Sequence, residues 1–63
     1  MEVCIEESQK TVHLEASTVK ELLAQLNIKY SSVIVSRNGA LVIESSPLKK
    51  EDKIVIIPVV SGG

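Results

Sequence analysis

The chain has 63 residues, of which 44% are hydrophobic and 24% are charged, with Tyr30 as the single aromatic residue. A chain of this length forms one domain at most, and folding buries only about 60% of the surface that the unfolded chain exposes. Seven Lys and Arg residues against eight Asp and Glu residues give a formal charge of -1. Because nucleic-acid binding requires a basic surface or aromatic stacking, no nucleic acid is expected as a partner.

Cysteine content and the longest apolar run set the expected compartment. Cys4 is the single cysteine, so no internal disulfide can form, and small secreted domains usually depend on such bonds. The first residues lack the basic and apolar segments of a signal peptide. The longest apolar run, residues 54–60, is far shorter than the roughly 20 residues that a membrane-spanning helix needs. The sequence therefore predicts a cytoplasmic protein with no membrane partner.

Residues 3–14 predict a β-hairpin with its turn at residues 7–10, because apolar and polar residues alternate on either side of the turn. Two cross-strand pairs are expected to face the core: Ile5 opposite Val12, and Val3 opposite Leu14. The same register places Cys4 opposite His13 on the other face of the hairpin.

A helix is predicted to begin after Thr18 and to end at Asn27. Residues 18–21, TVKE, form a capping box, in which the threonine side chain accepts a hydrogen bond from the amide three residues later. Asn27 is the expected C-cap. The apolar side chains between these ends have the spacing of one helical stripe: Val19, Leu22, Leu23 and Leu26.

A second hairpin is predicted around Asn38-Gly39, the preferred dipeptide of a two-residue type I′ turn, with residues 33–37 and 40–43 as its strands. The segments that follow, 44–47 and 49–52, have turn composition, and Leu48 between them is expected to close the end of the core.

The last strand is predicted over residues 53–59. Residues 54–57 are all apolar, as expected for a strand buried on both faces at the centre of a sheet. Pro58 is expected where ladder pairing has ceased, because proline has no N–H to donate.

This order of elements predicts an α+β fold, a mixed four- to five-stranded sheet with one helix packed across one face. The first and last strands would pair in parallel at the centre. One domain is expected over residues 1–60, followed by a flexible tail, residues 61–63. The sheet face opposite the helix would carry three apolar side chains: Ile34, Val55 and Ile57.

Patterns typical of catalysis or metal binding do not assemble in this sequence. One Cys and one His cannot form a zinc site of the usual kind, and the acidic pairs at 6–7 and 51–52 are interpreted as solvated turn residues. An enzyme hypothesis would depend on Cys4 being activated by His13. A half-buried cysteine beside a surface histidine is the simpler interpretation. We therefore expect neither an enzyme nor a bound metal or cofactor.

The sequence ends in Gly62-Gly63, two of only three glycines in the chain. At the average frequency of glycine, such a terminal pair arises by chance about once in 200 chains. A segment without Cβ atoms can extend through a channel too narrow for side chains and present its carboxylate to an enzyme. The pair therefore favours a function that uses the C-terminus.

The chain resembles the ThiS/MoaD family of small sulfur carriers, which are ubiquitin-like β-grasp proteins, over essentially its whole length. The resemblance rests on the order and spacing of four segments: residues 18–23, 33–42, 47–54 and above all 57–63, IPVVSGG. The short chain favours the thiamine-type carrier, ThiS, over the longer molybdopterin-synthase subunit. Residues 50–52, KED, depart from the commoner Asp-Gly-Asp turn, which affects the geometry of that loop only.

The resemblance implies that the protein is a substrate. An E1-like adenylyltransferase of the ThiF/MoeB type would use ATP to adenylate Gly63, and a persulfide would displace AMP to leave a thiocarboxylate. The sulfur would pass to an enzyme of thiamine or molybdopterin biosynthesis, and the free protein would be a monomer. Gly62 and Ser61 would give access to the terminus. The activating enzyme would dock on the sheet face that carries Ile34, Val55 and Ile57.

Two alternatives remain open at this point. In the first, an amine of another protein attacks the activated Gly63, which makes the chain a ubiquitin-like modifier of lysines. In the second, the chain is a small structural or interaction domain whose Gly-Gly end is incidental, so that deleting Gly62 and Gly63 changes nothing.

Overall fold

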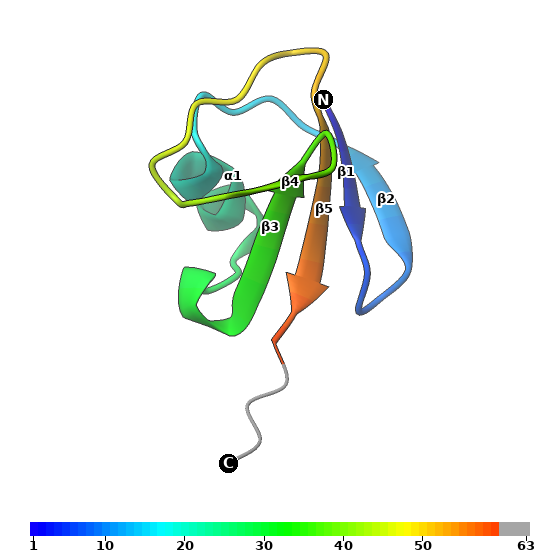
Figure 1. Cartoon of the computed structure of the whole chain (residues 1–63). Helices are drawn as coiled ribbons and strands as arrows, with labels where there is room; N and C mark the ends of the chain where they lie inside the picture. Colours follow the sequence, from blue (N-terminus) through cyan, green and yellow to red (C-terminus); the bar gives the residue numbers. More distant parts are fainter. Residues whose placement is uncertain (60–63) are drawn as a thin grey trace.

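A computed structural model describes residues 1–59 of the chain. Five strands form one sheet in the order β2-β1-β5-β3-β4, with a single α-helix beside it (Figure 1). The elements run in chain order as β1 (Glu2–Ile5), β2 (Lys10–His13), α1 (Val19–Leu26), a 3-10 turn η1 (Tyr30–Ser32), β3 (Val33–Arg37), β4 (Ala40–Val42) and β5 (Lys53–Pro58). β1 and β5 pair in parallel at the centre, and the other neighbours are antiparallel. The predicted α+β, β-grasp architecture is confirmed.

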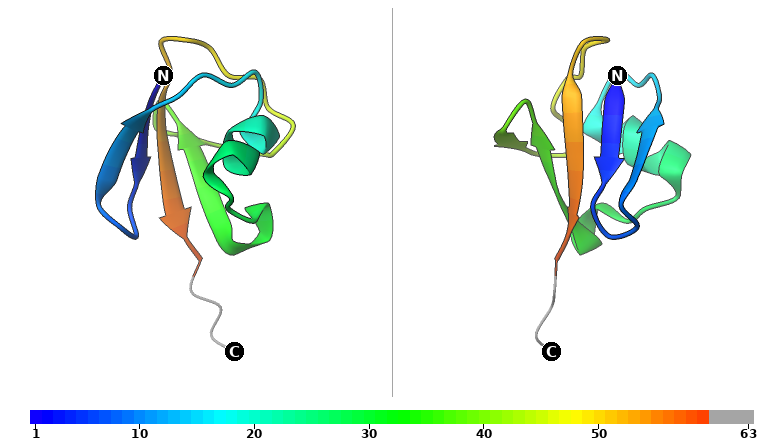
Figure 2. Two further views of the ribbon diagram at one scale, coloured as in Figure 1. Left: turned by 180° about the vertical axis from the view of Figure 1, so that it is seen from behind. Right: turned by 90° about the vertical axis from the view of Figure 1, so that its right-hand side faces the viewer.

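The core lies between α1 and one face of the sheet (Figure 2). One stripe of α1 meets side chains of the three central strands, and Leu48 closes the end, as predicted, with 8% of its surface exposed. The buried apolar residues are Val3, Val19, Leu22, Leu23, Val35, Leu48, Ile54 and Ile56. This single layer of contacts leaves the other face of the sheet without a covering element among residues 1–59.

Both predicted ends of α1 are confirmed. The Thr18 hydroxyl accepts a hydrogen bond from the backbone N–H of Glu21 at 3.2 Å. Asn27 has a φ of 59°, the left-handed conformation that asparagine tolerates better than most residues. The N–H of Ile28 then reaches back to the Leu23 carbonyl at 2.9 Å. These local bonds fix where the chain leaves the helix and turns toward β3.

The register predicted for the first hairpin is wrong by two residues. Val3 lies opposite Val12, Cys4 opposite Thr11, and Glu2 opposite His13. The turn spans residues 6–9 rather than 7–10, because Gln9 adopts a left-handed φ of 55° and donates its N–H to the Glu6 carbonyl. The pairing continues past the strands, where Met1 and Leu14 exchange backbone hydrogen bonds of 2.9 and 3.1 Å. A slip of two residues preserves the face of every side chain, so the predicted core side of the hairpin is unchanged.

The second hairpin has the predicted turn. Asn38 and Gly39 have φ values of 51° and 88°, as a type I′ turn requires, and Arg37 and Ala40 are the closing pair. The turn is also tied to β5, since the Asn38 N–H donates to the Lys53 carbonyl at 2.8 Å. This bond joins the tip of the hairpin to the beginning of the central strand.

Asp52, interpreted from the sequence as a solvated turn residue, is buried, with 6% of its surface exposed. One carboxylate oxygen accepts hydrogen bonds from Arg37 Nε at 2.7 Å and from the Lys49 N–H at 2.8 Å. The other accepts from Asn38 Nδ2 at 3.0 Å, and Asn38 Oδ1 in turn accepts from the Lys53 N–H. The Lys49 N–H, then the Asn38 and Arg37 side chains, lower the pKa of the Asp52 carboxyl below its ordinary value, against the opposing effect of burial. Asp52 therefore holds the 49–52 turn against the second hairpin.

Candidate functional site

The predicted modification site, Gly63, and the access residues Gly62 and Ser61 lie outside the described residues. The structure does describe the point from which they continue. β5 ends at Pro58, at the end of the sheet away from Met1 and the β3–β4 turn (Figure 1). Val59 follows and donates its N–H to the Ser32 carbonyl at 3.0 Å. The root of the C-terminal segment is therefore anchored to the body of the domain.

Pro58 corrects one expectation about the last strand. Pairing with β1 stops at Ile56, but pairing with β3 continues, with Pro58 opposite Val33. Successive N–H groups of a strand point to opposite sides. The Val59 N–H points toward β3, so the Pro58 nitrogen points to the opposite flank of β5, where β1 no longer pairs with it. Proline therefore removes no ladder hydrogen bond at this position.

The three residues predicted for partner docking lie together on the sheet face away from α1. Ile34 on β3 is directly opposite Ile57 on β5. Val55, two residues before Ile57, lies between Cys4 and Ser36 in the same sheet. Ile34 is 41% exposed, and the other two are half-buried by their neighbours. Ile34 and Ile57 form a directly paired apolar contact on this face, and Val55 extends it along β5.

The same face carries a more exposed apolar side chain that the sequence analysis did not include. Leu41 on β4 pairs with Ser36, which places it on this face, and it is 70% exposed. Ile43, just beyond β4, and Val59, just beyond β5, are exposed by 62% and 42%. The signal was present in the run ALVI at residues 40–43, where the two-residue period of a strand places Leu41 beside the predicted patch.

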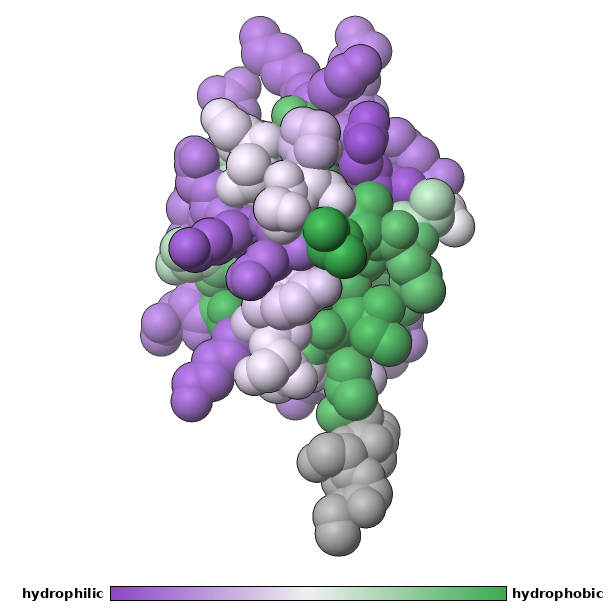
Figure 3. Space-filling view, turned by 60° about the vertical axis from the view of Figure 1, so that its left-hand side comes forward, coloured by the Kyte–Doolittle hydropathy of each residue, from purple (hydrophilic) through white to green (hydrophobic). Residues whose placement is uncertain are grey.

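We name Ile34, Leu41, Val55 and Ile57 the open-face patch. In the space-filling view, a continuous hydrophobic area runs over one side of the molecule down to the point where the described chain ends (Figure 3). An exposed apolar area of this kind is typical of protein interaction sites. Because this area reaches the end of the described chain (Figure 3), a protein bound there also lies near Val59, from which the last four residues continue.

The structure does not bring Cys4 and His13 into the direct cross-strand pair on which an enzyme hypothesis would depend. Cys4 is half-buried opposite Thr11, and His13 is exposed opposite Glu2. Among residues 1–59, no three His, Cys, Asp or Glu side chains are grouped so that they could hold a metal ion. No helix within that range is long and apolar enough to cross a membrane.

The model of the ThiS family matches residues 2–63. The matched range includes every strand and the helix described above, and it extends through the terminal Ser61-Gly62-Gly63. The similarity therefore covers both the folded body and the segment that was predicted to carry the chemistry.

Proposed function

The chain belongs to the ThiS family of small sulfur carriers, and on that basis we propose that its sulfur is carried as a thiocarboxylate on Gly63. Members of this family are not catalysts, and they work with E1-like activating enzymes and with enzymes that accept the sulfur. The observation that carries the proposal is the family match through residue 63, which includes the terminal glycines. The anchored root at Val59 and the adjoining open-face patch support it.

The proposed chemistry begins with the Gly63 carboxylate, which is a poor electrophile. One of its oxygens attacks the α-phosphorus of ATP on the activating enzyme, and pyrophosphate leaves. The terminal sulfur of a persulfide then attacks the acyl carbon and AMP leaves, which gives an acyl disulfide. A second thiol cleaves the sulfur–sulfur bond, is itself oxidised to a disulfide, and leaves the thiocarboxylate on Gly63. ATP is thus consumed by the partner.

The folded body has two roles in this proposal. The open-face patch binds the activating enzyme, and β5 directs the C-terminal segment toward the reaction centre. Four residues follow Val59, so they span at most about 14 Å when fully extended. The adenylating centre must therefore lie within about that distance of Val59 in the complex, and the enzyme must cover the surface around the root.

ATP–pyrophosphate exchange with the E1-like enzyme of the same host tests the first step. The wild-type chain is expected to support exchange, and a chain lacking Gly63 is not. The control is an Ala24→Ser variant, which changes an exposed residue on α1 and shows whether a mutation as such affects exchange. Exchange that persists without Gly63, or that never occurs with the wild-type chain, contradicts the proposal.

We place the delivered sulfur in thiamine biosynthesis, with molybdopterin biosynthesis as the second destination, because the matching family is named for the thiamine-type carrier, ThiS. The reducing cytoplasm is the proposed compartment, since the final step consumes a thiol. An immunoblot of a host lysate for this chain tests the alternative in which an amine of another protein attacks the activated Gly63. Slower-migrating conjugates that disappear with the Gly63 deletion would instead establish a protein modifier.

A further inference from the structure

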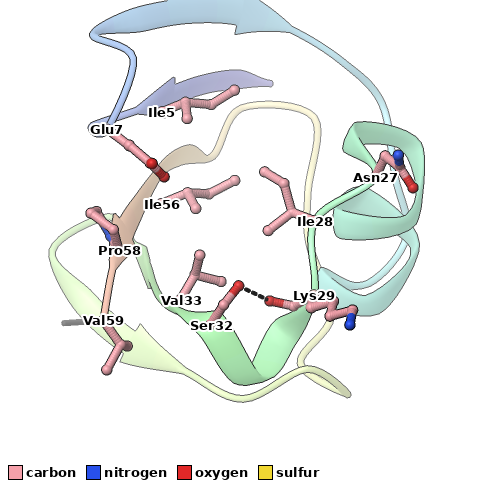
Figure 4. A pocket seen from close by; sticks show the side chains of 10 residues that line it. All are labelled: Ile5, Glu7, Asn27, Ile28, Lys29, Ser32, Val33, Ile56, Pro58 and Val59. Carbon is pink, nitrogen blue, oxygen red and sulfur yellow. Dashed lines mark hydrogen bonds between the residues drawn. The ribbon is translucent and has the colours of Figure 1, made fainter. Parts of the chain in front are cut away.

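A cavity opens at the end of the domain where β5 ends. Its volume is about 480 Å³, and it lies between the C-terminal end of α1, the 3-10 turn and the ends of β1 and β5 (Figure 4). The side chains of Ile5, Ile28, Val33 and Ile56 converge on its interior from four different segments. The cavity exists because β5 continues beyond the last residue of β1, which leaves one flank of β5 open.

The walls of this cavity are held by hydrogen bonds. Ile28 is fixed by its N–H bond to Leu23, and the Ser32 hydroxyl donates to the Lys29 carbonyl at 2.8 Å. The backbone carbonyl of Ser32 accepts a hydrogen bond from the N–H of Val59, and Val59 lines the cavity as well. The space is thus formed before any partner arrives, so that filling it costs little reorganisation.

The charged groups on the rim are not equivalent. Glu7 and Lys29 both line the cavity. The Glu7 carboxylate points over the opening toward Ile56, whereas the Lys29 ammonium points away from it (Figure 4). An occupant therefore meets the apolar side chains of Ile28 and Ile56 inside a lining of mixed polarity, and one carboxylate at the mouth (Figure 4). This arrangement suits a side chain with an apolar stem and a cationic end.

The cavity is continuous with the site of the proposed chemistry. Pro58 and Val59 form part of its lining, and they are the residues from which the C-terminal segment continues. An enzyme that draws Gly63 into its reaction centre must contact the surface within about 14 Å of Val59. The cavity lies inside that radius because Val59 lines it.

We propose that this cavity receives an arginine side chain of the adenylating enzyme, with its methylene groups against Ile28 and Ile56 and its guanidinium paired with Glu7. The proposal rests on the proposed function. Arginine fits better than lysine because its guanidinium is planar and more weakly hydrated, and because arginine is enriched among the residues that dominate binding energy at interfaces.

The test compares two charge reversals in the same turn. Glu7→Arg places a like charge at the mouth of the cavity, and Glu6→Arg makes the same change in net charge at an exposed neighbour that does not line it. In ATP–pyrophosphate exchange, Glu7→Arg is expected to raise the KM for the carrier by about tenfold with kcat unchanged, because like charges meet on docking. Glu6→Arg is expected to raise KM by clearly less than Glu7→Arg, because the Glu6 side chain does not line the cavity.

A steric variant and a compensating change complete the test. Ile28→Trp occupies part of the cavity from one wall without changing the net charge, and it should raise KM in a variant whose circular dichroism spectrum matches the wild type. Replacing the arginine of the enzyme that enters the cavity with glutamate should return the KM of the Glu7→Arg chain to the wild-type value. Equal KM values for Glu7→Arg and Glu6→Arg overturn the inference while exchange by the wild-type chain still supports the proposed function. Absence of exchange with the wild-type chain overturns both.

Discussion

Replacing Leu41 with serine should weaken docking about twice as much as it weakens folding. Leu41 is 70% exposed on the open-face patch. Complete burial of a leucine side chain contributes about 1.5–3 kcal/mol, so covering the exposed part on docking contributes about 1–2 kcal/mol. The expected increase in Kd for the adenylating enzyme is therefore about 5- to 30-fold. The smaller part that is already covered limits the loss of folding free energy to about 0.5–1 kcal/mol.

Calorimetric titration of the activating enzyme with wild-type and variant chains measures the loss of affinity, and urea unfolding of each chain measures the loss of stability. Leu41→Met is the matched variant, because it keeps an apolar side chain of similar size and should bind within about twofold of the wild type. A folded Leu41→Ser chain that binds as tightly as the wild type would show that the open-face patch is not the docking surface.

Three further predictions concern the fold that supports the site. Leu22→Ala should lower the free energy of unfolding by about 2–5 kcal/mol, because Leu22 is fully buried. A domain of this size has a total of about 3–9 kcal/mol, so a urea titration should show that most of the stability is lost. Gly39→Ala should lower the free energy of unfolding by about 1–2 kcal/mol in the same titration, because alanine is strained at the φ of 88°. An added Cβ would meet no atom within 4 Å, so no steric clash contributes. An unchanged midpoint would refute the assigned turn. Asp52 has a lowered pKa in the folded chain, so its stabilising contribution is present above the unfolded value of 3.8 and is lost as the pH falls through the lower folded value. Asp52→Asn should therefore be less stable at neutral pH and lose less stability on acidification than the wild type, and parallel acid-unfolding curves for the two chains would contradict this assignment.

Local signals in the sequence predicted the elements that depend on neighbouring residues. The cap at Thr18, the left-handed Asn27 and the Asn38-Gly39 turn each require only a few consecutive residues, and all three are present. The two-residue period likewise placed Ile34 and Ile57 on one face, because every second residue of a strand points to the same side of the sheet.

Features that depend on distant residues escaped prediction. Asp52 has the composition of a turn residue, but its partners Arg37 and Asn38 lie 15 and 14 residues earlier in the chain. The first hairpin is set by the left-handed Gln9 and by the terminal pairing of Met1, neither of which has a strong local signature. The cavity beside Val59 results from the unequal lengths of β1 and β5, which become apparent only when the strands are paired.

The most direct test of the account is the intact mass of this protein, purified without added thiols from its own host. A carrier should show a mass increase equal to the exchange of one oxygen for one sulfur, and a chain that lacks Gly63 should not. The increase should also disappear when the activating enzyme is removed from the host. An unmodified mass during growth that demands sulfur transfer, with no conjugates in the same lysate, would contradict the assignment of Gly63 as the site of sulfur attachment.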